Sequence, residues 1–167
     1  FGNDCALVEL NPEVRDTRRM TWKEYDLTQP EPNLPYRREI SWKIFNEKAN
    51  RCAHYLLERG VHPGDKVGIL MMNCLEWLPI YFGILKTGAI AVPLNFRYAS
   101  DEIDYCLNLA DISVLFFGPE FIGRLEAISD KIIAHRLLIY VGEGHEPTFS
   151  ENYVMSAMNY SSENLNI

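Results

Sequence analysis

Four continuous apolar runs at a regular spacing constrain the fold of this chain more than any other feature. They cover residues 67–72, 89–92, 114–117 and 137–141. The runs do not alternate apolar with polar residues, which is typical of strands buried on both faces of a parallel sheet. Each gap between runs is long enough for one crossover helix, as in a βαβ unit. The pattern predicts an α/β fold, with a mostly parallel sheet, helices on both faces and short strands before it.

The segment before the first run is expected to be irregular. Residues 6–10 and Arg37–Ser41 read as two short strands, and residues 21–25 are a further candidate. Three prolines at residues 29–35 exclude a helix or a central strand there, so we interpret this stretch as an insertion between hairpin-like strands. We divide the chain into leading strands and a proline-rich loop (1–41), an α/β subdomain (42–160) and a frayed tail (161–167).

Helices are predicted in the gaps. Ser41 is the expected N-cap of an amphipathic helix that ends near Arg59, with Gly60 as its C-cap. Ser100 is expected to cap a third helix, and residues 119–128 and 150–158 supply two more.

The second helix, over residues 74–86, is apolar almost all round, which predicts burial between layers. Asn73 and Glu76 resemble a capping box for it, and Pro79 is expected to cost a hydrogen bond or to cause a mild kink. Its rings Trp77, Tyr81 and Phe82 suggest either core packing or the lining of a ligand cavity.

Composition excludes several classes of function. The net charge of −7 argues against nucleic acid as the main partner and against an anionic membrane surface. No apolar run reaches the length of a transmembrane helix, and no export signal is visible. The four cysteines and four histidines lack the short spacing of a zinc site, so we expect no metal site and reduced thiols in a cytoplasmic protein.

The search for catalytic motifs gives few candidates. A glycine cluster at residues 142–145 follows a strand, where a phosphate loop would lie, but Glu143 would repel phosphate, and a plain turn is the simpler interpretation. Asp101, Glu102 and Asp104 could form an acid–base pair, although they also match the positive end of a helix.

Asn95 and Arg97 are the remaining candidates for a binding site. They follow the second apolar run, at the carboxyl end of a predicted strand, where open α/β sheets bind ligands. The alternative is that their side chains satisfy loop carbonyls and a nearby carboxylate.

An ordered series of short motifs resembles the start of the AMP-forming acyl-CoA synthetases, in the superfamily of adenylate-forming enzymes. The series is G-D-K-V, N-x-x-E-W, K-T-G-A and V-P-L-N, and the resemblance extends over most of residues 38–117. It implies the N-terminal subdomain of the large domain of these enzymes. The family's Ser/Thr/Gly-rich phosphate loop is absent from these residues, so we interpret the chain as an N-terminal fragment that is inactive alone.

The resemblance implies an acid–thiol ligase of fatty acid metabolism. A carboxylate would attack the α-phosphate of ATP to give an acyl-adenylate and pyrophosphate, and coenzyme A would then displace AMP. ATP, Mg²⁺ and coenzyme A are thus expected in the full-length enzyme, with none bound to the fragment and no catalytic residue within it. Asn95 and Arg97 would lie near the coenzyme A nucleotide, whereas Tyr105 stands where some relatives place a basic residue.

Two other functions stay open. One is a relative with a different acceptor, either a carrier-protein adenylation domain or a luciferase-like oxidase. The other is a self-contained, non-catalytic nucleotide-binding α/β module. The identity of the carboxylate and the presence of a homodimer are also open, because the substrate-pocket residues of the family come mostly from later in the chain.

Overall fold

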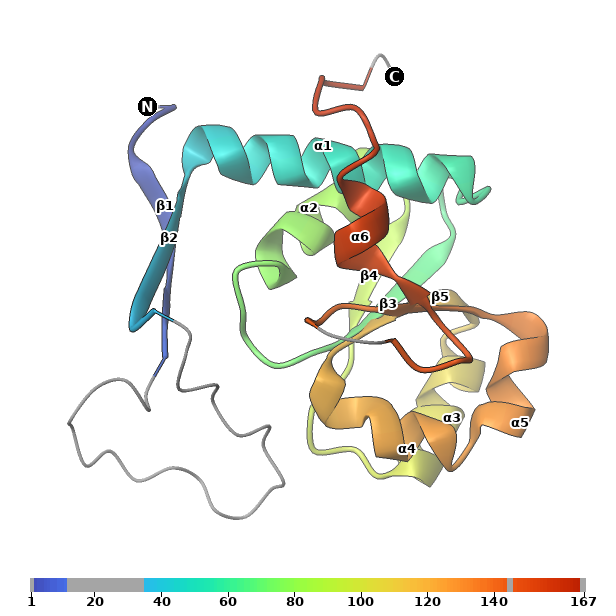
Figure 1. Ribbon diagram of the computed structural model, residues 1–167. Helices are drawn as coiled ribbons and strands as arrows, with labels where there is room; N and C mark the ends of the chain where they lie inside the picture. Colours follow the sequence, from blue (N-terminus) through green and yellow to red (C-terminus); the bar gives the residue numbers. More distant parts are fainter. Residues whose placement is uncertain (1, 12–34, 144–145, 166–167) are drawn as a thin grey trace.

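A computed structural model describes residues 2–11, 35–143 and 146–165. Figure 1 shows a parallel sheet between two layers of helices, with a separate hairpin at one end. The strand order in the sheet is β4-β3-β5-β6-β7, and all four neighbouring pairs are parallel. The strands are β1 (Cys5–Leu10), β2 (Arg37–Ser41), β3 (Lys66–Leu70), β4 (Ile90–Pro93), β5 (Ile112–Phe117), β6 (Leu137–Tyr140) and β7 (Glu151–Asn152). The predicted fold class is therefore confirmed.

The four apolar runs all form strands of this sheet. Burial on both faces holds for β3, β5 and β6 but is wrong for β4, which lies at the edge of the sheet and leaves Ile90 51% exposed. An edge strand has a neighbour on one side only, and the short β4 ends at Pro93, which has no N–H to offer a further strand.

The helices are divided between the two faces of the sheet (Figure 1). One face packs against α1 (Trp42–Glu58), α2 (Trp77–Lys86) and α6 (Tyr153–Ala157) through side chains such as Val67, Ile69 and Phe116. The other packs against α3 (Ser100–Leu109), α4 (Ile122–Glu126) and α5 (Ser129–Ile132) through Leu115 and Phe117. Each such buried side chain contributes about 1.5–3 kcal/mol.

The hairpin β1–β2 confirms two of the leading strands. It is antiparallel, with Glu9 opposite Arg38, and these two residues form an ion pair. The candidate strand at 21–25 and most of the proline-rich loop at 29–35 lie outside the described residues.

Helix α1 begins at its predicted N-cap and ends near Arg59 as predicted, but its C-cap is one residue earlier than expected. The Ser41 hydroxyl accepts a hydrogen bond from the backbone N–H of Ile44 at 3.3 Å. At the other end, Arg59 is the C-cap residue. Gly60 follows it with a φ of +78°, a left-handed conformation that glycine adopts without strain.

Helix α2 differs from its prediction in three ways. It begins at Trp77, and the side chain of its N-cap Glu76 makes no capping hydrogen bond but accepts one from Lys48 at 2.9 Å, so the predicted capping box is wrong. Pro79 lies in the first turn, where the backbone N–H has no intrahelical partner, so it costs no hydrogen bond. Leu78, Phe82 and Leu85 are 37–44% exposed, so only one face of this apolar helix is buried.

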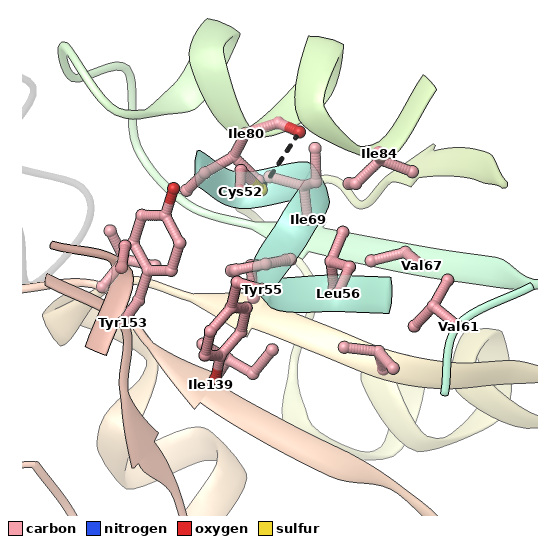
Figure 2. Packing of buried hydrophobic residues seen from close by; sticks show 14 of the residues in the cluster. Cys52, Tyr55, Leu56, Val61, Val67, Ile69, Ile80, Ile84, Ile139 and Tyr153 are labelled. Atoms are coloured by element: carbon pink, nitrogen blue, oxygen red, sulfur yellow. Dashed lines mark hydrogen bonds between the residues drawn. The ribbon is translucent and has the colours of Figure 1, made fainter. Parts of the chain in front are cut away.

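The buried face of α2 lies very close to α1. Gly83 faces Cys52, and a Cβ atom added at Gly83 would lie 2.5 Å from the Cβ of Cys52. Figure 2 shows Cys52 beside Ile80 and Ile84 of α2, with the Cys52 thiol donating to the Ile80 carbonyl at 3.9 Å. The absence of a side chain at Gly83 therefore sets the distance between the two helices.

Two boundaries in the second half of the chain also differ. The N-cap of α3 is Ala99, whose N–H is bound by the Glu102 carboxylate at 2.8 Å, and Ser100 is the first helical residue. The helix predicted at 150–158 begins instead with strand β7, which pairs with β6 through Ile139 and Glu151. A two-residue strand carries no periodicity that a sequence pattern could detect.

The residues after Tyr160 lie along α1. The Asn50 amide donates to the Ser162 carbonyl at 2.8 Å, and a His54 ring nitrogen lies 3.2 Å from the Glu163 carbonyl oxygen. The division of the chain at residues 41 and 160, with a frayed tail, stays a prediction.

Candidate functional site at the carboxyl edge of the sheet

The strand order creates a topological switch point between β3 and β5. The chain leaves β3 and pairs β4 on one side of it, then crosses the sheet and pairs β5 on the other side. In open α/β sheets, ligands bind outside the carboxyl ends of the strands near such a point. The loops that follow β3, β4, β5 and β6 therefore define the candidate site.

At the switch point, a carboxylate lies over a glycine. The Gly118 N–H donates to the Leu70 carbonyl at 3.1 Å, which joins the ends of β5 and β3. A Cβ atom at Gly118 would lie 2.5 Å from an oxygen of Glu120, so a larger residue here would require this carboxylate to move. The negative charge disfavours a phosphate at this point, and sequence reasoning missed it because Glu120 follows a glycine and a proline that read as a plain helix start.

Asn95 and Arg97 lie in the loop between β4 and α3, and both are exposed. The Asn95 side-chain oxygen accepts a hydrogen bond from the backbone N–H of Arg97 at 3.0 Å, and the Asn95 carbonyl accepts from Tyr98 at 3.1 Å. The Arg97 guanidinium lies 5.4 Å from the centre of the Phe96 ring. Asn95 thus serves the loop itself, by binding a backbone amide, while its position at the carboxyl edge agrees with the sequence-based prediction.

Arg124 connects this loop to another element. From α4, its guanidinium donates to the carbonyls of Phe96 at 2.7 Å and Tyr98 at 3.2 Å. The guanidinium also lies 5.3 Å from the ring centre of Phe121, a side chain only 1% exposed. No sequence signal indicated Arg124, because the contact joins residues 26 and 28 positions apart on different elements.

The acidic residues of α3 are not brought together as an acid–base pair. Glu102 caps the helix at Ala99, and Asp104 accepts from the Asn108 amide at 3.0 Å and lies 4.0 Å from the Lys131 ammonium. The interpretation of this cluster as a helix start is the one that these contacts support.

The rings of α2 extend a row of aromatic contacts. Trp77 stacks on Tyr81 with centroids 5.7 Å apart, and Phe82 contacts both Tyr81 and Phe45. Trp77 also lines a groove of about 590 Å³ between this helix and β1. The rings therefore pack against one another, as the first interpretation predicts, and Trp77 also lines a groove, as the second predicts. Phe82 remains 43% exposed.

The described part of the glycine cluster at 142–145 is held by local contacts. The Tyr140 hydroxyl donates to the Glu143 carbonyl at 3.1 Å, and the Glu143 carboxylate lies 3.6 Å from the Arg38 guanidinium. Gly144 and His145 lie outside the described residues, so a ligand loop here stays untested.

A second polar cluster joins the end of α1 to β7 and to Tyr160, which follows α6. The Glu151 carboxylate accepts from the Tyr55 hydroxyl at 3.0 Å and lies 2.7 Å from Arg59, which also donates to Tyr160 at 2.6 Å. Burial raises the pKa of the Tyr55 phenol, so this hydroxyl stays a hydrogen-bond donor at ordinary pH.

Two further properties bear on function. Within residues 2–11, 35–143 and 146–165, no group of three or more His, Cys, Asp or Glu side chains could hold a metal ion. The described helices also include none that is both long and apolar enough to cross a membrane.

Comparison with known proteins identifies the family. The family described as AMP-binding enzyme matches residues 15–157, and the chain therefore belongs to it. A 3-oxocholest-4-en-26-oate–CoA ligase of Rhodococcus rhodochrous is 32% identical over 113 residues, which are 68% of this chain and 20% of the ligase. The long-chain-fatty-acid–CoA ligase FadD13 of Mycobacterium tuberculosis is 35% identical over 98 residues, 59% of this chain and 19% of that protein.

Solved structures give the same fold. The anthranilate CoA ligase AuaEII in complex with anthranoyl-AMP superposes with a TM-score of 0.71 at 28% identity, covering 75% of this chain and 24% of that one. The N-terminal domain of FACL13 from Mycobacterium tuberculosis gives 0.67 at 24% identity, covering 78% of this chain and 31% of that one, which supports the fold alone. The chain spans about a fifth of the length of the curated relatives it matches.

Proposed function

We propose that this chain is the N-terminal part of an acid–thiol ligase that makes acyl-coenzyme A. A carboxylate oxygen of the substrate attacks the α-phosphate of ATP, and pyrophosphate leaves. The thiol sulfur of coenzyme A then attacks the acyl carbon of the acyl-adenylate, and AMP leaves. The observation that carries the proposal is the match of residues 15–157 to the AMP-binding enzymes, together with the CoA ligases among the similar proteins.

In this proposal, the chain supplies a scaffold for the ligase and one ligand-binding region, at the carboxyl edge of its sheet. The switch point does not suit ATP phosphates, because the Glu120 carboxylate lies over Gly118 and would repel them. The described residues also offer no acidic cluster for Mg²⁺. Residues outside the described ranges are therefore proposed to hold ATP and Mg²⁺, and the metal ion would polarise the phosphates when bound.

Asn95 and Arg97 are proposed to contact the coenzyme A nucleotide. Both are exposed at the carboxyl edge, and the Arg97 guanidinium supplies a positive charge that suits phosphate. Changing Arg97 to Ala in the full-length ligase is expected to raise the KM for coenzyme A by tenfold or more, since a charge-assisted hydrogen bond contributes about 1.5–3 kcal/mol. Arg37→Ala is the matched control, because Arg37 is another exposed arginine, on β2, and pairs with Glu39 at 2.9 Å.

The reaction class is tested by pyrophosphate release. The full-length ligase is incubated with ATP, Mg²⁺, coenzyme A and a panel of aliphatic and aromatic carboxylates. Release that depends on both a carboxylate and coenzyme A is expected, whereas the 167 residues alone are expected to release none. No carboxylate-dependent release with any acid would refute the proposal.

The alternatives give different results in the same experiments. A relative with another acceptor exchanges ATP with pyrophosphate in the presence of a carboxylate but forms no coenzyme A thioester. A self-contained nucleotide-binding module would give saturable heat with ATP, AMP or coenzyme A when the 167 residues are titrated alone. The cytoplasmic location and a homodimer stay predictions.

A further inference from the structure

We propose that Arg124 is a positioning residue for coenzyme A, which it serves by fixing the loop that carries Asn95 and Arg97. This inference rests on the proposed function and adds a residue that the sequence did not indicate. Arg124 itself contacts two loop carbonyls, and it is the loop that would meet the ligand.

The hydrogen bonds of the loop show what Arg124 adds. The loop makes its own turn through Asn95 and binds the sheet where the Leu94 N–H donates to the Ile69 carbonyl at 2.8 Å. These contacts form the turn from Asn95 to Tyr98 and join the start of the loop to β3. The Arg124 guanidinium binds the middle and the end, at the Phe96 and Tyr98 carbonyls, and so ties the loop to α4.

The guanidinium is suited to this role by its shape and its packing. One nitrogen of its planar guanidinium, Nη1, donates to both carbonyls, and the plane fixes the directions of its N–H groups, whereas a lysine ammonium rotates freely on a flexible stem. Its position over the buried Phe121 ring limits the rotamers that Arg124 can adopt. A loop held in this way needs little further ordering when a ligand binds, and such preorganisation increases affinity.

Without the guanidinium, the loop must lose conformational freedom when coenzyme A binds, and this entropic cost weakens binding. In Arg124→Gln, the Phe96 and Tyr98 carbonyls lose their link to α4, and the exposed Asn95 and Arg97 sample more conformations. The KM for coenzyme A is expected to rise about tenfold, which corresponds to about 1.4 kcal/mol. The adenylation step is expected to change less than about twofold, a difference of roughly 0.4 kcal/mol.

Arg136 offers a matched control at the opposite edge of the sheet. Its side chain donates to the Ile112 carbonyl at 3.0 Å and to the Asn108 side chain at 2.6 Å, so it also links a backbone carbonyl to a helix. Ile112 begins β5, which places this contact at the amino edge. Arg136→Gln is expected to lower stability to a similar extent without changing the KM for coenzyme A.

The experiment measures both half-reactions in the full-length ligase carrying Arg124→Gln, Arg124→Lys or Arg136→Gln. ATP–pyrophosphate exchange reports adenylation, and initial rates over a range of coenzyme A concentrations report KM and kcat. Hydrogen exchange of the amides at residues 95–99 reports loop order directly. The proposal expects faster exchange and a raised KM for both Arg124 variants, larger for Gln than for Lys, so either variant suffices if the other fails to fold.

Each contrary outcome refutes a distinct statement. An unchanged KM for coenzyme A, or an equal rise in Arg136→Gln, overturns the positioning role of Arg124. Unchanged hydrogen exchange in a variant with a raised KM overturns the proposed route through loop order. If the unaltered ligase shows no carboxylate-dependent exchange at all, the proposed function fails and this inference fails with it.

Discussion

Replacing Gly83 with alanine should destabilise the protein, although the same change usually stabilises a helix. The added Cβ would lie 2.5 Å from the Cys52 Cβ, 2.7 Å from its sulfur and 2.9 Å from the Ala49 carbonyl oxygen. Non-bonded carbon atoms prefer separations of about 3.5–4.0 Å, so α1 and α2 must move apart by roughly 1 Å. Their shared core then loses contact along the whole interface.

The magnitude follows from two opposing terms. Overpacking a well-packed core costs about 1–3 kcal/mol, and the upper part of this range applies because the Ala49 carbonyl belongs to the backbone and cannot rotate away. Alanine returns up to about 1 kcal/mol of helix propensity. The expected net loss is about 2 kcal/mol, which lowers Tm by roughly 4–8 °C in a chain of this size.

Urea denaturation and thermal unfolding of the chain measure this loss. Gly123→Ala is the control, because Gly123 lies in α4 with nothing within 4 Å of an added Cβ. That change is expected to stabilise the protein by about 0.5–1 kcal/mol. In a double-mutant cycle, Cys52→Gly should recover part of the loss in Gly83→Ala, with a coupling energy of about 1–2 kcal/mol. If Gly83→Ala is neutral or stabilising, like the control, the reasoning about close helix contact is wrong.

Three further predictions concern stability. Ser41→Ala removes the N-cap of α1 and should cost about 1 kcal/mol in urea denaturation, while Ser41→Asn should cost little. Burial raises the pKa of the Cys52 thiol from 9.0 to about 12, so the neutral thiol is favoured by folding; this contribution is present below about pH 9 and is lost as pH rises toward 12. Cys52→Ala should therefore show a smaller alkaline loss of stability than the unaltered chain. Glu151→Ala leaves Arg59 and the Tyr55 hydroxyl without their shared acceptor and should cost about 1–3 kcal/mol, with earlier proteolysis after α6, whereas Glu58→Ala on the exposed surface should have no such effect.

The sheet was predictable because its signal is local. An unbroken apolar run such as residues 114–117 can be buried on both faces only where layers cover both, and the gaps between runs leave room for the helices. The edge position of β4 and the existence of β7 were not predictable in this way. Both depend on strand order, and strand order is set by contacts between residues far apart in the sequence.

The limits of prediction at α2 have a related cause. The composition of this helix indicates burial, yet burial depends on what lies next to each side chain, and Phe82 contacts Phe45 of α1 but remains 43% exposed. The role of Gly83 could not be predicted from the sequence, because it depends on Cys52, which is 31 positions earlier in the sequence. The position of Asn95 and Arg97 at the sheet edge could be predicted because a strand end is a local feature, whereas Arg124 reaches the same loop from another element.

The contact between Arg59 and Glu151 spans 92 residues and has a consequence for synthesis. The strand order lets each new strand add to an existing edge: β4 and β5 on either side of β3, then β6 and β7 outward. The sheet can therefore grow in the order in which the ribosome makes it. Helix α1 is synthesised early, whereas α6, which packs against it, is synthesised after the other helices described. Tyr55 and Leu56 of α1 therefore stay partly uncovered until Tyr153 has been synthesised. At about 5–20 residues per second this delay is roughly 5–20 s, during which the nascent chain presents apolar side chains of α1 to chaperones.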